Sequence, residues 1–540
     1  MIIDRRSFVA TGLLGYGAFA IPGFAAAAGV ADLRGFTHAV ASGEPGGDSM
    51  LLWTRFVPAS GGAVELRAEI AETADFARIV AGGSTVTGPW RDYTAKITVT
   101  GLMPGQDYHY RFVAPDGSMS PVGRTRTLPD ERARTWRAAI FSCSNLGFGY
   151  FNAYAHAAAR DDIDCAIHLG DYFYEYASGY YPSAKEIVGG RVPLPAHEIV
   201  QLADYRLRHA SYRADPDLQA LHQRLPMIVQ WDDHESANDA WEGGAENHDG
   251  KTEGAWNPRR AAAIQAYREW MPVSEEPWKA YNSGRLATLF RTETRLLGRT
   301  EQPDIAPLFK QADRAAALKK FRDGAWLDPA ATMMGGDQER WLAEAMRASV
   351  KSGRAWQVVG FGTIMGETMM PRDALSWLGG SSDRARGYVQ SGIAAGQAGL
   401  PFNFDNWGGY PAARARFLRS AQALGGSTVV ISGDSHNAWA YDLAQDGKPA
   451  AVEFAGHAVT SMGYEGGIGA DPKTVAAALV ATNPELKWCD TSRRGYMALT
   501  IARDRVTNDW VMADTVKRRT PGATIGHRAT VMRERNAMAV

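Results

Sequence analysis

The chain has 540 residues, and its 58 Lys and Arg against 59 Asp and Glu give a net charge of −1. At roughly 150 residues per domain, this length predicts two to four domains. With 45% hydrophobic and 22% charged residues, the composition indicates a globular protein and excludes a disordered one. A net charge this close to zero gives no electrostatic reason to expect binding to nucleic acid or to an anionic membrane. The cysteines, Cys143, Cys165 and Cys489, are too few for a disulfide framework.

The first 28 residues are typical of an export signal and not of a folded element. Arg5-Arg6 precedes an apolar run, residues 8–28, that ends in alanines. A transmembrane anchor is the alternative, but Pro22, the glycines and the small-residue end argue against it. Twin arginines predict export of an already folded protein by the twin-arginine machinery. No later stretch is apolar enough to span a membrane, so we expect a soluble mature protein in the periplasm or outside the cell.

Residues 36–129 show the pattern of an all-β domain. Short runs of β-branched and aromatic residues alternate with turns such as Pro104-Gly105 and Asp116-Gly117. This spacing predicts a small β-sandwich of the immunoglobulin or fibronectin type III kind. The expected strands include 49–54, 64–70, 93–99 and 108–114.

Residues 135–540 alternate short apolar runs with helical patterns, which predicts an α/β domain. The apolar runs 137–141, 163–169, 227–229, 356–359 and 428–431 are the expected strands, and each ends in a cluster of polar residues. The expected helices are 258–271, 337–350 and 411–424. Because α/β sheets place their sites at the carboxyl ends of the strands, we expect these polar clusters to meet at one edge.

Several of these strand ends have side chains suited to metal binding. Asp171 follows one strand, and Tyr174 is three residues further on, within reach of the same cation. Tyrosinate prefers a strong Lewis acid such as ferric iron. The alternative is an Asp that caps a turn beside a core Tyr. Asp434 and His436 share a face of an extended segment, and Cys143 ends the first core strand.

The Asp232-Asp233-His234-Glu235 quartet at a further strand end is a second candidate, with a solvated loop as its alternative. Cys165 and Cys489 are interpreted as inert, the first inside a strand and the second in a polar loop. No Gly-x-Ser-x-Gly elbow accompanies Ser435, so a serine esterase is not supported.

Together these segments resemble the PhoD-like alkaline phosphatases and phosphodiesterases, which are related to the purple acid phosphatases. The matching motifs occur in family order: Val40–Pro45, Leu52–Arg55, Phe141-Ser142-Cys143, His168–Tyr172 with Tyr174-Glu175-Tyr176, Asp204-Tyr205-Arg206 with Tyr212-Arg213, Trp231–Glu235, and Gly433–His436. The resemblance implies an α/β metallophosphatase-type β-sandwich flanked by helices, after the small β domain. It also implies ferric iron on Cys143, Asp171, Tyr174 and His436, and one or two calcium ions on Asp171, Asp233 and Asp434.

The sequence departs from the wider metallophosphatase pattern on the side of the second metal. No His is present in residues 358–363, and Asp434 stands where that pattern has a His. The remaining oxygen ligands suit calcium better than zinc. His457 is a candidate for an extra site residue or for a group that supports one of the ligands.

The resemblance implies hydrolysis of phosphomonoesters and phosphodiesters. We expect an iron-activated hydroxide to attack phosphorus, His234 to protonate the leaving alkoxide, and Asn145 and Asn238 to bind the phosphoryl oxygens. The helix with Arg206, Arg208, His209 and Arg213 either adds positive potential or is a surface face of salt bridges, the interpretation we favour. The alternatives are a phosphodiesterase or phospholipase-D-like enzyme on the same site and, from another class, a catalytically inactive secreted binding protein.

Overall fold

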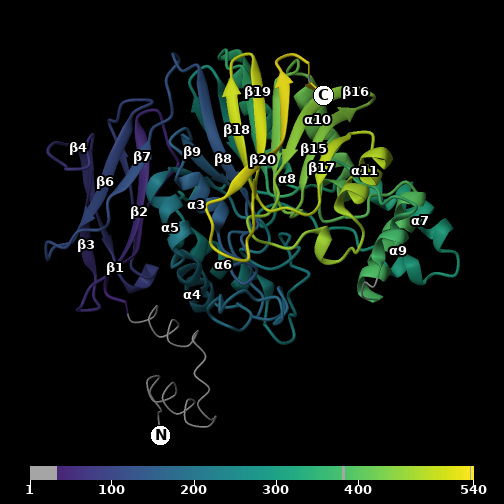
Figure 1. Ribbon diagram of the computed structural model, residues 1–540, viewed down its shortest axis with the longest axis horizontal. Coiled ribbons are helices and arrows are strands. Elements are labelled where there is room, and N and C mark those ends of the chain that lie inside the picture. The colour runs from purple at the N-terminus through teal and green to yellow at the C-terminus, as the bar shows by residue number, and fades with distance from the viewer. Residues whose placement is uncertain (1–32, 380–382, 536, 540) are drawn as a thin grey trace, which may run out of the picture.

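The computed structural model describes residues 33–379, 383–535 and 537–539 (Figure 1). The expected export signal, residues 1–28, lies outside these residues. The strands form three sheets. The ten-stranded sheet has the order β21-β20-β19-β18-β8-β9-β10-β1-β2-β5, the seven-stranded sheet β11-β12-β13-β14-β16-β15-β17, and the four-stranded sheet β4-β3-β6-β7.

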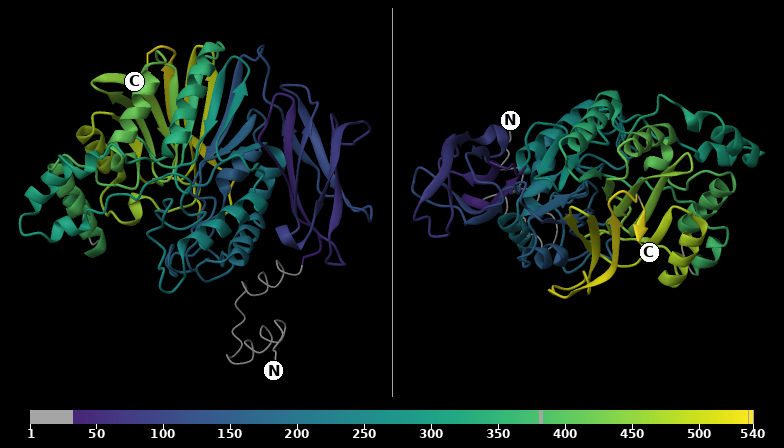
Figure 2. Two further views of the ribbon diagram at one scale, coloured as in Figure 1. Left: turned by 180° about the vertical axis from the view of Figure 1, so that it is seen from behind. Right: turned by 90° about the horizontal axis from the view of Figure 1, so that it is seen from above.

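The all-β region at the N-terminal end forms a sandwich at one end of the molecule, opposite α7 and α9 (Figures 1 and 2). Its strands are β1 (Gly35–Gly43), β2 (Ser49–Val57), β3 (Val64–Ala71), β4 (Ile79–Thr87), β5 (Thr94–Thr100), β6 (Asp107–Val113) and β7 (Gly123–Arg126). Alternate residues such as Leu52, Leu66 and Tyr110 fill its core. One of its sheets continues into the rest of the protein, because Gly43 of β1 pairs in parallel with Met227 of β10.

The larger α/β region is built on the rest of the ten-stranded sheet and on the seven-stranded sheet. In the first lie β8 (Thr135–Phe141), β9 (Cys165–His168), β10 (Met227–Val229), β18 (Gly495–Ala502), β19 (Arg505–Ala513), β20 (Ala523–Met532) and β21 (Met538–Ala539). In the second lie β11 (Lys279–Ser283), β12 (Ala287–Arg291), β13 (Trp356–Phe361), β14 (Thr428–Ser432), β15 (Ala438–Gln445), β16 (Lys448–Ala455) and β17 (Leu486–Asp490).

The central strands are apolar on both faces because each face is covered. In β8, Ala138 and Ile140 belong to the core shared with the seven-stranded sheet, whereas Ala139 and Phe141 face the helices. The two sheets therefore pack face to face with helices outside, and the expected flanked sandwich is confirmed. Cys165 lies in the shared core as expected, but Cys489 is a buried residue of β17 and not part of a polar loop.

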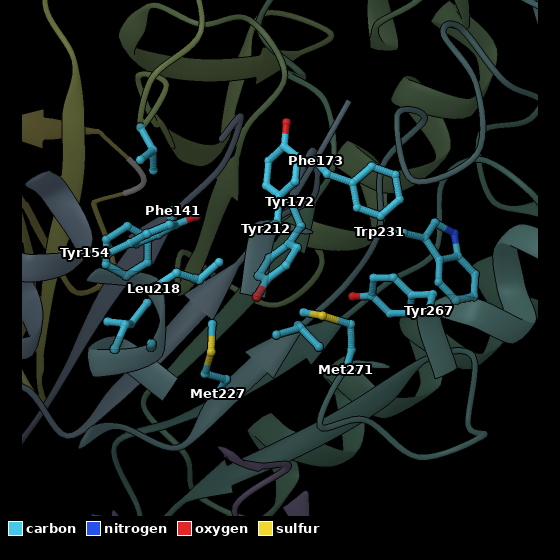
Figure 3. Packing of buried hydrophobic residues seen from close by; sticks show 14 of the residues in the cluster. Phe141, Tyr154, Tyr172, Phe173, Tyr212, Leu218, Met227, Trp231, Tyr267 and Met271 are labelled. Atoms are coloured by element: carbon cyan, nitrogen blue, oxygen red, sulfur yellow. The ribbon is translucent and has the colours of Figure 1, made fainter. Parts of the chain in front are cut away.

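Helices cover the outer faces of the two sheets of the α/β region. The α-helices are α3 (Asn152–Ala158), α4 (Leu202–Arg213), α5 (Pro216–Arg224), α6 (Trp256–Trp270), α7 (Arg314–Arg322), α8 (Gly335–Lys351), α9 (Asp383–Gln397), α10 (Pro411–Gln422) and α11 (Pro472–Thr482). Short 3-10 helices occupy Pro89–Arg91, Ala306–Lys310, Ala325–Leu327, Ala374–Leu378, Trp407–Gly409 and Tyr464–Gly466. Figure 3 shows the aromatic packing beside the ten-stranded sheet, where Phe141, Tyr154 and Tyr212 lie among α3, α4 and α5. No helix of the described residues has the length and apolarity that a bilayer span requires.

Candidate metal centre

The carboxyl ends of strands from both sheets meet at one place. β8, β9 and β10 are parallel neighbours in one sheet, and β13 and β14 are parallel neighbours in the other. Cys143 follows β8, Asp171 follows β9, Asp233 follows β10, and Asp434 and His436 follow β14. Because the ends of parallel strands share an edge, side chains far apart in the sequence are brought together.

Possible metal-donor atoms form three buried or half-buried groups in the described part of the chain. The first contains Cys143, Asp171 and His436, the second Asp171, Asp233 and His234, and the third Asp232, Asp233 and Asp434. Within each group the donor atoms lie within 4.8 Å of one another. Asp171 belongs to two groups and Asp233 also to two, so the groups form one continuous cluster.

The Tyr174 phenol lies beside the first of these groups. Its hydroxyl is 3.0 Å from His436 Nε2 and 3.3 Å from Asp171 Oδ2. Ser461 Oγ donates a hydrogen bond of 2.5 Å to the same hydroxyl. The six residues that the sequence predicts as metal ligands are therefore all assembled at one site.

The backbone is strained at four of the six predicted ligands. Cys143, Asp171, Asp434 and His436 have φ values of 61°, 54°, 64° and 61°, a left-handed region that non-glycine residues rarely occupy. Such strain persists where the surrounding structure imposes it, and it is concentrated at functional sites. Gly170 shows how tightly the site is built, because a Cβ there would lie 2.4 Å from the backbone nitrogen of Asp232.

The donor chemistry fits two unlike cations. Asp171 Oδ1 is buried and has no hydrogen-bond partner among the described residues, although Asp171 lies at the centre of the cluster. Burial, with the nearby Asp171 carboxylate, raises the pKa of the Cys143 thiol well above its usual value, so the protein alone does not favour the thiolate. A cation bound there would supply the missing positive charge. Sulfur, phenol and imidazole donors suit iron, while the carboxylates of Asp233 and Asp434 suit a hard cation such as calcium.

His436 is oriented by contacts outside the donor cluster. Its Nδ1 atom lies 2.7 Å from the carbonyl oxygen of Met462, and Tyr181 stacks on the ring with centroids 6.2 Å apart and planes at 16°. A proton on Nδ1 donated to this carbonyl leaves Nε2 free to act as a ligand.

His234 lies between a carboxylate and an aromatic ring. Its Nδ1 atom lies 2.7 Å from Glu175 Oε2, and its ring centroid lies 4.2 Å from that of Tyr174. Burial lowers the pKa of His234, but the Asp233 and Glu175 carboxylates outweigh this effect and raise the pKa well above its usual value. In the metal-free chain these carboxylates therefore act in favour of the imidazolium form.

Asn145 and Asn238 lie near the cluster, but their side chains already have partners. Asn145 Nδ2 donates to Tyr181 O at 3.2 Å, and its Oδ1 accepts from the backbone N–H of Gly147. Asn238 Nδ2 donates to Glu246 Oε2 at 3.1 Å. Their roles in substrate binding remain predictions.

The interpretation of the basic helix as a surface face of salt bridges is wrong for three of its four residues. Arg208, His209 and Arg213 are buried, because α4 packs this face against the core. Arg208 donates to backbone carbonyls, including those of Leu194 and Pro195, and Arg213 lies 3.8 Å over the Trp53 ring. Arg206 alone forms the expected salt bridge, with Glu269 at 2.6 Å.

His457 has a structural contact instead of a place in the donor groups. It is buried, and its Nε2 lies 3.2 Å from the carbonyl oxygen of Val511 on β19. None of the donor groups found in the described residues includes it.

A buried arginine behind the acidic residues was not predicted from the sequence. Arg295 donates to Asp232 through Nε and Nη2 at 2.7 and 2.9 Å, and it donates to Asp405 through Nη1 at 2.7 and 2.8 Å. The Nη2 atom of Arg295 is 3.6 Å from Asp233 Oδ1. Because Asp232 is held at both oxygens, the Asp233 and Asp434 carboxylates are the more available donors. The sequence signal that could have indicated Arg295 is the strand β12, because Arg295 follows the end of this strand.

Glu235, part of the expected quartet, connects two of the strand ends. Its carboxylate accepts hydrogen bonds from the backbone N–H groups of Asp171, Tyr172 and Asp232 at 3.1, 2.6 and 2.8 Å. It therefore fixes the turn after β9 against the turn after β10, which aligns Asp171 with Asp233.

Comparison with known proteins identifies the family of this chain. A family model described as PhoD-like phosphatase matches residues 138–510, and the model for the N-terminal domain of that family matches residues 24–129. Alkaline phosphatase D of Bacillus subtilis (strain 168) is 31% identical over 525 residues, which cover 93% of this chain and 81% of the relative.

Comparison with solved structures also finds phosphatases. A structure of PhoD has a TM-score of 0.76 at 28% identity and covers 94% of this chain and 92% of the other. A purple acid phosphatase from yellow lupin (Lupinus luteus) seeds has a TM-score of 0.54 at 12% identity, covers 93% of this chain and 75% of the other, and shares the fold. The chain therefore belongs to the PhoD-like phosphatase family.

Proposed function

We propose that this phosphatase is an exported, metal-dependent enzyme that hydrolyses phosphomonoesters and phosphodiesters and releases inorganic phosphate. The observation that supports this most is the convergence of thiol, phenol, imidazole and carboxylate donors from the strand ends of both sheets, with Asp171 common to two donor groups. Export is supported by the twin-arginine pattern in residues 1–28.

In this proposal Cys143, Asp171, Tyr174 and His436 hold ferric iron, and Asp171, Asp233 and Asp434 hold calcium. When bound, such cations supply an activated water nucleophile and offset charge on the phosphoryl oxygens. Thr363 Oγ1 donates to Asp434 Oδ2 at 2.7 Å and orients this carboxylate. Arg295 neutralises Asp232 and keeps the acidic side of the site assembled.

His234 donates the proton that the leaving alkoxide requires. Glu175 accepts from Nδ1, so the proton on Nε2 is the one available to substrate. Glu175 is itself fixed by hydrogen bonds from Asn238 N and Asn247 Nδ2 at 2.8 and 2.9 Å. The ring of His234 is therefore held in one orientation, and proton transfer needs no rearrangement of the imidazole.

Elemental analysis and visible absorption test the metal assignment on protein purified without chelator. We expect iron and calcium, with a tyrosinate–iron charge-transfer band that Tyr174→Phe removes. Tyr93→Phe, in the N-terminal sandwich, is the matched control and should keep the band. A colourless, iron-free and fully active enzyme would contradict the iron assignment.

Rates on a nitrophenyl monoester and a bis-nitrophenyl diester, measured side by side, separate the two activities. A strong preference for the diester would make the enzyme chiefly a phosphodiesterase on the same site. If the protein is purified without bound metal and hydrolyses neither ester, the result would instead support the alternative of an inactive binding protein.

A further inference from the structure

Two tyrosines form an aromatic surface in the segment between β9 and α4. The rings of Tyr176 and Tyr180 have centroids 5.0 Å apart and planes at 39°. The Tyr180 side chain is 64% exposed, and Tyr176 is half-buried. We call this pair the aromatic wall. A large exposed aromatic side chain beside a buried polar site is the kind of feature that serves in ligand contact.

The aromatic wall adjoins the proton donor of the site. The Tyr176 ring lies 5.3 Å from the His234 ring, centroid to centroid, with planes at 65°. The two ring contacts therefore connect His234, through Tyr176, to the exposed ring of Tyr180.

The backbone of the aromatic wall is held firmly. The buried guanidinium of Arg208 donates to the carbonyl oxygens of Tyr174 and Tyr176. Ser178 N donates to Ala196 O at 2.8 Å, and Tyr180 N donates to Ala177 O at 3.1 Å. A surface with a fixed backbone loses little conformational entropy when a ligand binds against it.

The position of the wall indicates which part of a substrate it would contact. If His234 protonates the leaving oxygen, the rest of the leaving alcohol extends past His234. We propose that the aromatic wall is a leaving-group subsite for phosphate esters whose leaving alcohol bears a flat ring, such as a nucleobase or an aryl group. This inference rests on the proposed function, because it uses His234 as the proton donor. Stacking on aromatic side chains tolerates any base, so one wall accepts several ring types.

Two substrates with the same scissile bond test this subsite: adenosine 5′-monophosphate and ribose 5-phosphate. We expect the metal-loaded enzyme to prefer the nucleotide. Tyr180→Ala should lower kcat/KM for the nucleotide about tenfold and leave the value for ribose 5-phosphate unchanged. Tyr180→Phe should retain the preference, because the ring is kept. Trp90→Ala is the matched control, since Trp90 is 57% exposed in the N-terminal sandwich.

The outcomes separate this inference from the proposed function. If the wild-type enzyme hydrolyses both substrates equally well, or if Tyr180→Ala slows both to the same extent, the subsite is refuted and the phosphatase stands. If the metal-loaded wild-type enzyme hydrolyses no phosphate ester, nitrophenyl phosphate included, the proposed function fails and the subsite fails with it.

Discussion

The Nδ1 atom of His234 lies 2.7 Å from Oε2 of Glu175, and both side chains are buried at the metal-donor cluster, one group of which includes His234. Glu175 belongs to the segment after β9, whereas His234 follows β10. The pair therefore joins two strand ends and sets the direction in which the imidazole presents Nε2.

This pair predicts a dependence on the leaving group. Glu175→Gln should lower kcat on alkyl phosphates by about 10- to 100-fold, because the imidazolium loses the carboxylate that orients and stabilises it. On nitrophenyl phosphate the loss should be under about threefold, since a good leaving group needs little protonation. Steady-state rates on both substrates check this expectation.

Glu367→Gln provides the control for that comparison. Its carboxylate is 40% exposed and lies 3.6 Å from Arg414, outside the donor groups. Both rates should stay at the wild-type level in this variant. An equal loss on alkyl and nitrophenyl esters in Glu175→Gln would contradict a role through His234.

Calcium binding should strengthen as pH rises. Burial, followed by the nearby Asp232 carboxylate, raises the pKa of Asp434 to about 8 in the metal-free chain. Below that pH the Asp434 carboxyl holds a proton that calcium must displace, so affinity should rise up to about tenfold per pH unit and level off above about pH 8. Titration calorimetry at about pH 6, 7, 8 and 9 measures this dependence. Equal affinity at all four values would rule it out.

Arg208 should be a large contributor to stability. Its guanidinium is buried and donates to backbone carbonyls of the segment after β9. Arg208→Met leaves those oxygens without a donor, which should lower the free energy of unfolding by about 3 kcal/mol. Urea denaturation measures the change. Arg340 is the control, because it forms an exposed ion pair with Asp337. Arg340→Met should change the free energy of unfolding by under about 0.5 kcal/mol. A similar small change in the free energy of unfolding for both variants would refute the large contribution of Arg208 to stability.

Glu44 should stabilise the protein at neutral pH and lose this effect in acid. Its carboxylate accepts from Arg291 at 2.9 Å, Lys279 at 3.0 Å and Ser274 at 3.0 Å, and it connects β1 with β12. Burial alone would raise the pKa of Glu44, but Arg291 and Lys279 outweigh it and lower the pKa. A lowered native pKa means that the stabilisation is complete above the unfolded value of about 4.3 and is lost as pH falls through the native value.

Glu44→Gln should therefore lower the free energy of unfolding by about 3 kcal/mol at pH 7, because Arg291 is left buried without its counter-charge. The gap between variant and wild type should narrow below about pH 4. Urea unfolding of both proteins at pH 7 and below about pH 4 tests this expectation. An equal difference in the free energy of unfolding at the two pH values would disprove the link to the ionisation of Glu44.

Local sequence was enough to predict the class of the fold and the ligand types at the strand ends. Apolar runs identify β8, β9, β10, β13 and β14, and the polar residues after each run are near neighbours along the chain. Cys143, Asp171, Asp434 and His436 could thus be expected at one site, because parallel strands end at a common edge. Asp233 is singled out within its quartet only by the resemblance to the family.

Which charges are neutralised, and which surfaces are buried, depends on the folded chain. Arg295 and Asp405 are 110 residues apart, and nothing in either local sequence indicates that they pair. Arg208 has the pattern of a surface helix, yet it is buried because backbone carbonyls from another segment supply its hydrogen bonds. A buried charge is stable only beside partners that folding brings from elsewhere in the chain, so its place cannot be read from its own neighbourhood.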